Sequence, residues 1–155
     1  MRDASDEFEP GDRFQIGGGR AEYLLVKVIS RSSGDDYWDG NWLTCEVRIF
    51  AGGFRGKFQA NLRTDELERF ATEVRTLHDD LKTAARLEPM EEQLTLVLQG
   101  DGRGHIECQG AAMDVVGTGN LLTFGLQLDQ TQLFGTMVQL FELLNRYPVL
   151  GSPAA

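Results

Sequence analysis

Apolar residues recur at every second position along much of the chain, which is typical of half-buried β-strands. The clearest run is residues 54–63, where apolar or small residues alternate strictly with polar ones. The same pattern predicts further strands near residues 13–16, 21–29, 42–50, 94–98, 106–110 and 122–128. Glycine-rich turns separate most of these runs. The alternation therefore predicts about seven antiparallel strands.

Twice the period changes to the spacing of an amphipathic helix. The first stretch begins at Thr64, which is suited to an N-cap, and continues to about Leu81. The second follows Asp129, whose spacing to Gln132 matches a capping box, and stops before Pro148. Because every apolar face must be buried against another, both helices are expected to pack on one antiparallel sheet. The predicted fold class is α+β.

The two strand-to-helix passages match each other at a fixed offset. Six apolar positions of the first passage fall opposite six of the second: Phe58, Ala60, Leu62, Leu67, Val74 and Leu77 against Phe124, Leu126, Leu128, Leu133, Leu140 and Leu143. The match predicts two βββα-like halves. Common ancestry and repeated use of the same packing both explain it.

A length of 155 residues suits one domain. Residues 1–12 are acidic and poor in apolar positions, so they are predicted to form a disordered lead-in before a single α+β domain at 13–149 and a short tail at 150–155. No apolar run approaches a membrane span, and residues 1–7 do not resemble a signal peptide. Cys45 and Cys108 lie in alternating strands, as free buried thiols do. These features predict a cytoplasmic protein with no membrane contact.

The net charge of −9 opposes sequence-independent binding of nucleic acid, which depends on cations that neutralise phosphates. A basic protein partner suits this charge, although acidity also serves solubility alone. Four cations could nevertheless share the outer face of two strands with Trp42 and Phe50: Arg48, Arg55, Lys57 and Arg63. Such an island could bind an acidic ligand or a single strand. Outward placement of polar residues by simple alternation explains it equally, and the overall negative charge favours that explanation.

An acidic and aromatic turn precedes the strand near residues 42–50. It holds both tryptophans of the chain, and large rings beside a turn require either a pocket beneath them or a partner. The candidate partner-binding residues are Asp35, Asp36, Tyr37, Trp38, Asp39 and Asn41. A structural corner is the alternative, because Asp, Gly and Asn tolerate the backbone angles of tight turns. Trp38 is expected to be the more exposed ring, and Trp42 to be structural.

Catalytic and metal-binding patterns are weak. Asp35, Asp39 and Glu46 match positions of a calcium loop, but Tyr37 replaces a ligand and the loop runs into a strand. The histidines His78 and His105 lack the spaced companions of a zinc site. No nucleophile elbow or nucleotide-binding loop is present. The sequence therefore predicts neither an enzyme nor a bound metal or cofactor.

Four segments resemble the bacterial WapI-family immunity proteins. They are residues 36–43 (DYWDGNWL), 51–58 (AGGFRGKF), 100–107 (GDGRGHIE) and 119–124 (GNLLTF), and the resemblance runs from about Asp36 to Val149. It implies a non-enzymatic protein that neutralises a polymorphic or contact-dependent toxin by binding the toxin domain in the cytoplasm. A basic nuclease-type toxin would suit the acidic charge. A small-ligand or accessory binding module that uses the same aromatic turn is the alternative.

Overall fold

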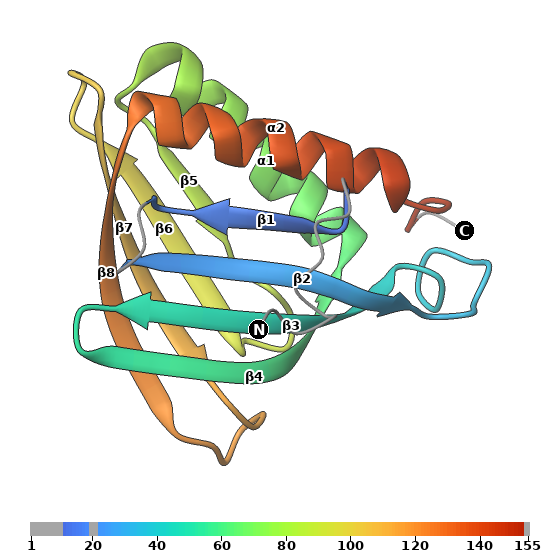
Figure 1. Ribbon diagram of the computed structural model, residues 1–155. Coiled ribbons are helices and arrows are strands. Elements are labelled where there is room, and N and C mark those ends of the chain that lie inside the picture. Colours follow the sequence, from blue (N-terminus) through green and yellow to red (C-terminus); the bar gives the residue numbers. More distant parts are fainter. Residues whose placement is uncertain (1–10, 19–21, 154–155) are drawn as a thin grey trace, which may run out of the picture.

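The strands divide into two antiparallel sheets of four, each followed in the chain by a helix (Figure 1). This computed structural model describes residues 11–18 and 22–153. The first half contains β1 (Arg13–Ile16), β2 (Tyr23–Arg31), β3 (Trp42–Ala51), β4 (Phe54–Arg63) and α1 (Thr64–Asp80). The second contains β5 (Ala84–Leu87), β6 (Leu94–Gly100), β7 (His105–Met113), β8 (Leu121–Asp129) and α2 (Gln130–Arg146). Strand order follows the chain within each sheet, β1-β2-β3-β4 and β5-β6-β7-β8.

The α+β class and the two helices are confirmed. The described residues hold eight strands in two sheets, where the sequence predicts about seven in one sheet. The additional strand is β5, which lies inside the stretch that the alternation leaves as a connection. Each half thus has one more strand than a βββα unit. Residues 1–10 of the expected lead-in and 154–155 of the expected tail lie outside the described residues.

The inner faces of the two sheets form the core. In Figure 1 the strands of the second sheet cross behind those of the first. Cys45 pairs with Ala60 across β3 and β4, and Cys108 pairs with Leu126 across β7 and β8. Ala60 and Leu126 are one of the pairs that match at the fixed offset, so both cysteines occupy equivalent places in the two halves.

Each helix covers the edge strand of the opposite half. On α2, Gln139 Oε1 accepts the backbone N–H of Gln15 in β1 at 2.8 Å, and Thr136 Oγ1 donates to the Gln15 carbonyl at 2.5 Å. On α1, Glu73 Oε1 accepts the backbone N–H of Arg86 in β5 at 3.2 Å. These side chains satisfy backbone groups that an unpaired edge would leave open. Among the described residues, neither helix is both long and apolar enough to cross a membrane.

The helix starts differ between the halves. Asp129 and Gln132 form the predicted capping box, with Gln132 N donating to Asp129 Oδ1 at 2.7 Å and Asp129 N to Gln132 Oε1 at 3.0 Å. The N-cap assignment of Thr64 is wrong, because Thr64 is the first residue inside α1 and Arg63 occupies the N-cap position. Glu66 Oε1 accepts the Arg63 backbone N–H at 2.7 Å.

The two thiols should be unreactive in the folded protein. Both cysteines are free and buried, as predicted, and burial raises the pKa of each thiol to about 12. Since the thiolate is the nucleophile, we expect neither Cys45 nor Cys108 to react within minutes with an aromatic disulfide reagent at pH 8. The same protein in denaturant should titrate both thiols, which serves as the control. Rapid stoichiometric reaction of the native protein would contradict this burial.

Candidate functional site

The β2–β3 loop, residues 32–41, is longer than its counterpart 101–104 in the second half and contains all six predicted partner-binding residues. The last residue of the loop is Asn41, whose side chain is 0% exposed. Asn41 Oδ1 accepts hydrogen bonds from Thr64 Oγ1 at 2.8 Å and Arg31 Nη2 at 2.9 Å. The same oxygen accepts the backbone N–H of Leu150 at 2.8 Å, and Asn41 Nδ2 donates to the carbonyls of Tyr37 and Leu150 at 2.8 and 2.9 Å. Asn41 therefore joins the loop to β2, to α1 and to the C-terminal segment.

The tip of the loop is a tight turn closed by its own residues. Asp36 Oδ1 accepts the backbone N–H of Asp39 at 2.7 Å, and the Asp36 carbonyl accepts that of Gly40 at 2.8 Å. Ser32 Oγ donates to the Asp39 carbonyl at 2.5 Å. A Cβ added at Gly34 or Gly40 would lie 2.6 Å from the facing backbone. The close approach of the two sides of the loop thus requires glycine at these two positions, and Asp36 closes the turn through its hydrogen bond.

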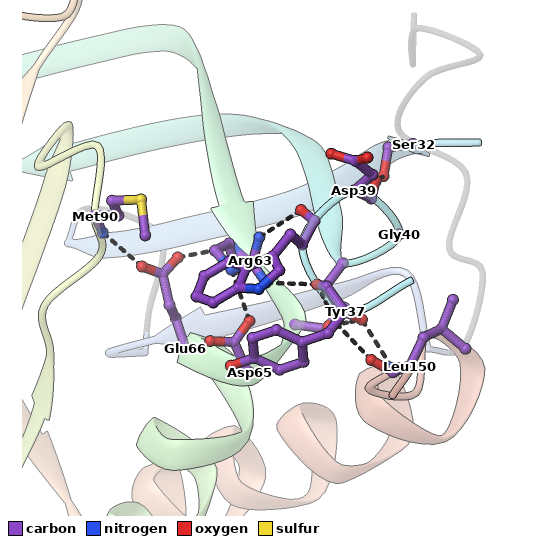
Figure 2. Close-up of polar contacts among 12 residues, drawn as sticks. Ser32, Tyr37, Asp39, Gly40, Arg63, Asp65, Glu66, Met90 and Leu150 are labelled. Atoms are coloured by element: carbon purple, nitrogen blue, oxygen red, sulfur yellow. Dashed lines mark hydrogen bonds and ion pairs between the residues drawn. The ribbon is translucent and has the colours of Figure 1, made fainter. Parts of the chain in front are cut away.

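Arg63 lies beneath the loop and holds it through hydrogen bonds and ring contacts (Figure 2). It is 1% exposed, and its guanidinium donates to the carbonyls of Tyr37 at 2.7 Å and Trp38 at 2.9 Å. Nε donates to Asp65 Oδ1 at 2.9 Å. The guanidinium carbon lies 5.0, 5.2 and 5.1 Å from the ring centroids of Tyr37, Trp38 and Trp42, within cation–π range. One buried cation thus fixes both the backbone and the rings of the loop.

The position of Arg63 corrects its predicted place on a basic outer face. Alternation assigns it to solvent, but the loop folds over it and supplies two rings and two carbonyls, while Trp42 of β3 supplies a third ring. Arg63 occupies the same place in the first half as Asp129 in the second. Asp129 accepts a hydrogen bond there, whereas an arginine has no acceptor and cannot cap. An arginine at a helix N-cap is the one signal in the sequence that could have revealed this role.

Glu66 ties the helix start to the second half. It is 8% exposed and accepts the backbone N–H groups of Arg63 and Met90, at 2.7 and 2.5 Å (Figure 2). Burial raises the pKa of Glu66, and these two hydrogen bonds act in the opposite direction. Glu66 therefore joins the start of α1 to the connection between β5 and β6.

The C-terminal segment closes the other side of the loop. Arg31 Nε donates to the Gly40 carbonyl at 2.8 Å, and its Nη2 donates to the Pro148 carbonyl at 2.7 Å. A Cβ on Gly151 would lie 3.3 Å from the Tyr37 backbone nitrogen. Residues 148–151, part of which the sequence assigns to a tail, thus pack on the loop.

The predicted site residues separate into two groups. Asp35, Asp36 and Asp39 are exposed, and the Trp38 ring is 54% exposed. Asn41 is buried, and Tyr37 is half-buried with its ring edge-on to Trp38 at 4.9 Å between centroids. Trp42 is half-buried over Arg63, so the expected order of exposure of the two tryptophans is confirmed. The loop therefore exposes one indole and three carboxylates to solvent, while Asn41 and Arg63 hold its backbone through hydrogen bonds.

Sequence reasoning missed an open pocket between the loop and the carboxylates of α1. Tyr37 lines an open pocket of about 430 Å³ with carboxylates of α1 and the C-terminal residues. Its charged lining residues are Asp65, Glu68, Glu73 and Arg69. Partial burial raises the pKa of the Tyr37 phenol, and the neighbouring Asp65 carboxylate raises it further. Tyr37 of the loop and the carboxylates of α1 thus border one pocket, which only the folded chain brings together.

The calcium-loop alternative gains no support from this geometry. Glu46 lies on β3 and pairs with Arg48 at 2.7 Å and Lys57 at 3.8 Å, on a strand beyond the turn. Within residues 11–18 and 22–153, no group of three or more His, Cys, Asp or Glu side chains could hold a metal ion.

Comparison with known proteins gives the family. The sequence model of the immunity protein WapI-like family matches residues 15–148. The chain belongs to this family. The matched range begins in β1 and ends after α2, so it covers both halves and the whole β2–β3 loop. Membership in the WapI-like family implies toxin immunity as the function class. A search of curated proteins finds no match.

Proposed function

We propose that this WapI-like protein is a non-enzymatic immunity protein that neutralises its cognate toxin domain by binding it through the acidic loop surface. We define this surface as Asp35, Asp36, Trp38 and Asp39 of the loop with Asp65 and Glu68 of α1. The observation that carries the proposal is a half-exposed indole among exposed carboxylates on a loop whose backbone is held by hydrogen bonds from the buried side chains of Asn41 and Arg63.

Preorganisation is the physical reason why such a loop suits binding. Ordering a loop on association costs free energy, and a loop already fixed by Arg63 and Asn41 avoids most of that cost. Tryptophan is among the residues that contribute most at interfaces, particularly where it is surrounded by contacts that exclude water. Trp38 is the anchor of the proposed interface. Tyr37 and Asn41 act within the loop to hold Trp38 in place.

The charge of the surface defines the partner. Carboxylates on the loop and on α1 favour a cationic protein surface, such as the substrate-binding surface of a nuclease-type toxin in the cytoplasm. Blocking such a surface requires complementary charge and shape and no chemical step. The proposal therefore assigns the carboxylates to recognition.

The test first searches beside this gene for a large secreted protein with a toxic C-terminal domain, and then uses that domain as the binding partner. A full-length Asp35→Asn/Trp38→Ala/Asp39→Asn variant should bind that domain about 100-fold more weakly in calorimetric titration, because an anchor ring and two charges are lost. Asp36 is retained because its carboxylate holds the turn. Thermal unfolding of the variant should stay close to that of the parent.

The matched control is Leu121→Ala, which removes another exposed apolar side chain, 61% exposed, on β8. Its affinity for the toxin domain should be unchanged. Equal affinity of the triple variant and the parent would refute the assignment of this surface. Failure of the parent itself to bind the neighbouring toxin domain would count against direct neutralisation.

A further inference from the structure

Each sheet has two edge strands, and the protein protects the four edges differently. Side chains of α2 bond to β1, and a side chain of α1 bonds to β5. On β4 the Gln59 carbonyl accepts a hydrogen bond from Gln93 Nε2 at 3.1 Å, and Arg55 and Lys57 place positive charge along the strand. Within the described part of the chain β8 has no such cover, and residues 121–128 contain no charged residue and no proline. An edge strand without these protections is open to pairing with another strand.

The strand register shows which backbone groups of β8 are free. Met113 donates its backbone N–H to the Gln93 carbonyl at 2.8 Å, so odd-numbered residues of β7 bond toward β6 and even-numbered ones toward β8. Through the β7–β8 register, the even-numbered residues of β8 bond to β7. The backbone N–H and C=O groups of Thr123, Gly125 and Gln127 therefore face away from the sheet. These three residues are exposed, and no described residue bonds to these backbone groups.

An open pocket of about 270 Å³ lies beside the start of this edge, between β4 and β8. Three consecutive residues of β4, 55–57, and three at the start of β8, 120–122, contribute to its lining. Because alternate side chains of a strand point to opposite faces, consecutive residues share a pocket where the strand edge itself borders it. In Figure 1 the turn between β3 and β4 lies on the same side of the molecule as β8, at the opposite end of β3 from the acidic loop. Two strand edges therefore border this pocket.

Gly56 keeps the pocket open. It lies opposite the fully buried Ile49 and on the same face of β4 as Ala60, yet a Cβ added at Gly56 would contact nothing within 4 Å beyond its chain neighbours. Its φ is not positive, so the backbone conformation does not require glycine. A glycine inside a strand often marks the close approach of a ligand or of another backbone. Pockets for drug-sized ligands measure about 300–1,000 Å³, so this smaller pocket suits a single side chain.

We propose that the edge of β8 binds an extended, uncharged polypeptide segment of a partner protein by strand addition, and that one apolar side chain of this segment fills the pocket beside Gly56. In this binding mode backbone hydrogen bonds supply affinity, and pockets for alternate side chains supply specificity. A second copy of this chain is not the occupant, because the inner side chains of its own β8, such as Phe124 and Leu126, are already buried in its core. The site is separate from the acidic loop surface, so the inference does not rest on the proposed function.

The probe is a synthetic peptide of threonines with one central phenylalanine and a lysine at each end, acetylated and amidated at its termini. Hydrogen exchange of the full-length protein, followed by NMR, reports where it binds. When four-fifths of the protein is bound, exchange at Thr123, Gly125 and Gln127 should slow about fivefold, because an amide paired with an added strand exchanges only from the free protein. Exchange at Phe124, whose backbone bonds to β7, should stay unchanged.

Gly56→Leu tests the pocket, because the new side chain occupies the space that the anchor needs. It should weaken binding of the phenylalanine peptide about tenfold or more, the loss expected when one apolar side chain is no longer buried. The matched control is Gly135→Leu, which adds the same side chain on the exposed surface of α2, where a Cβ also meets nothing within 4 Å. The control should bind the peptide as the parent does.

Thr123→Pro tests the backbone edge, because proline removes one outward N–H and is tolerated where the N–H of an edge strand faces solvent. Binding should weaken about fivefold, as expected for one lost hydrogen bond. Thr123→Ala keeps the N–H group and should bind as the parent does. Thermal unfolding of each variant verifies that the fold is retained.

Three outcomes would overturn the proposal. The first is that the peptide does not bind, or binds without slowing exchange at the three β8 amides. The second is equal binding of a peptide with alanine in place of phenylalanine, because the pocket would then hold no anchor. The third is slow exchange at these amides in the protein alone that increases with protein concentration, which would assign the edge to a second copy of the chain.

Discussion

Replacing Arg63 by alanine should lower the free energy of unfolding by about 3–5 kcal/mol, the range for removing one partner of a buried, hydrogen-bonded charge. The substitution removes three hydrogen bonds, to Tyr37, Trp38 and Asp65, and leaves two carbonyls facing a cavity. It also removes the cation between three aromatic rings. The loss should therefore exceed what an arginine on a strand surface would give.

Denaturant unfolding measures this loss, and quenching of tryptophan fluorescence follows the loop. Arg69→Ala is the matched control, because Arg69 is exposed on α1, and its effect should stay within about 0.5 kcal/mol. Arg63→Lys should recover little, since an ammonium lacks the planar fork that reaches two carbonyls and a carboxylate. A loss below about 1 kcal/mol in Arg63→Ala would mean that Asn41 alone holds the loop.

The same residue shows where sequence reasoning stops. Alternation correctly places the inner faces of β3 and β4, because a period of two is a local property of strands. It fails at Arg63, where the loop before Trp42 folds back over the strand end and converts an outward position into a buried one. The composition of the loop indicates a tight turn that carries aromatic side chains. It does not indicate which cation lies beneath them, because that depends on tertiary contact.

The division into two sheets is likewise a tertiary feature. From the sequence alone, β4 and β8 could pair and join the strands into one sheet, since both read as ordinary half-buried strands. β5 escapes prediction because it is four residues long and contains two alanines, so its alternation carries little apolar signal. Its edge is completed by Glu73 of the preceding helix α1, which accepts the backbone N–H of Arg86. The pocket between Tyr37 of the loop and the carboxylates of α1 was missed for the same reason.

Replacing Phe70 by alanine should cost about 3–5 kcal/mol, as large-to-small changes at fully buried aromatic positions do. Phe70 on α1 is 0% exposed, and its ring lies 6.2 Å from that of Phe14 in β1, so it packs a helix against the first sheet.

Phe124→Ala should cost a similar amount, because this 7% exposed ring covers Gly110 on the neighbouring strand. The control is Phe54→Ala, whose ring is 66% exposed, and it should shift stability by less than about 0.5 kcal/mol. Urea unfolding with an unchanged m-value reports these losses as changes in stability alone. Losses near zero at Phe70 and Phe124 would be incompatible with this packing, because a buried phenyl ring cannot be removed without either a cavity or a collapse of the two helices onto the sheets.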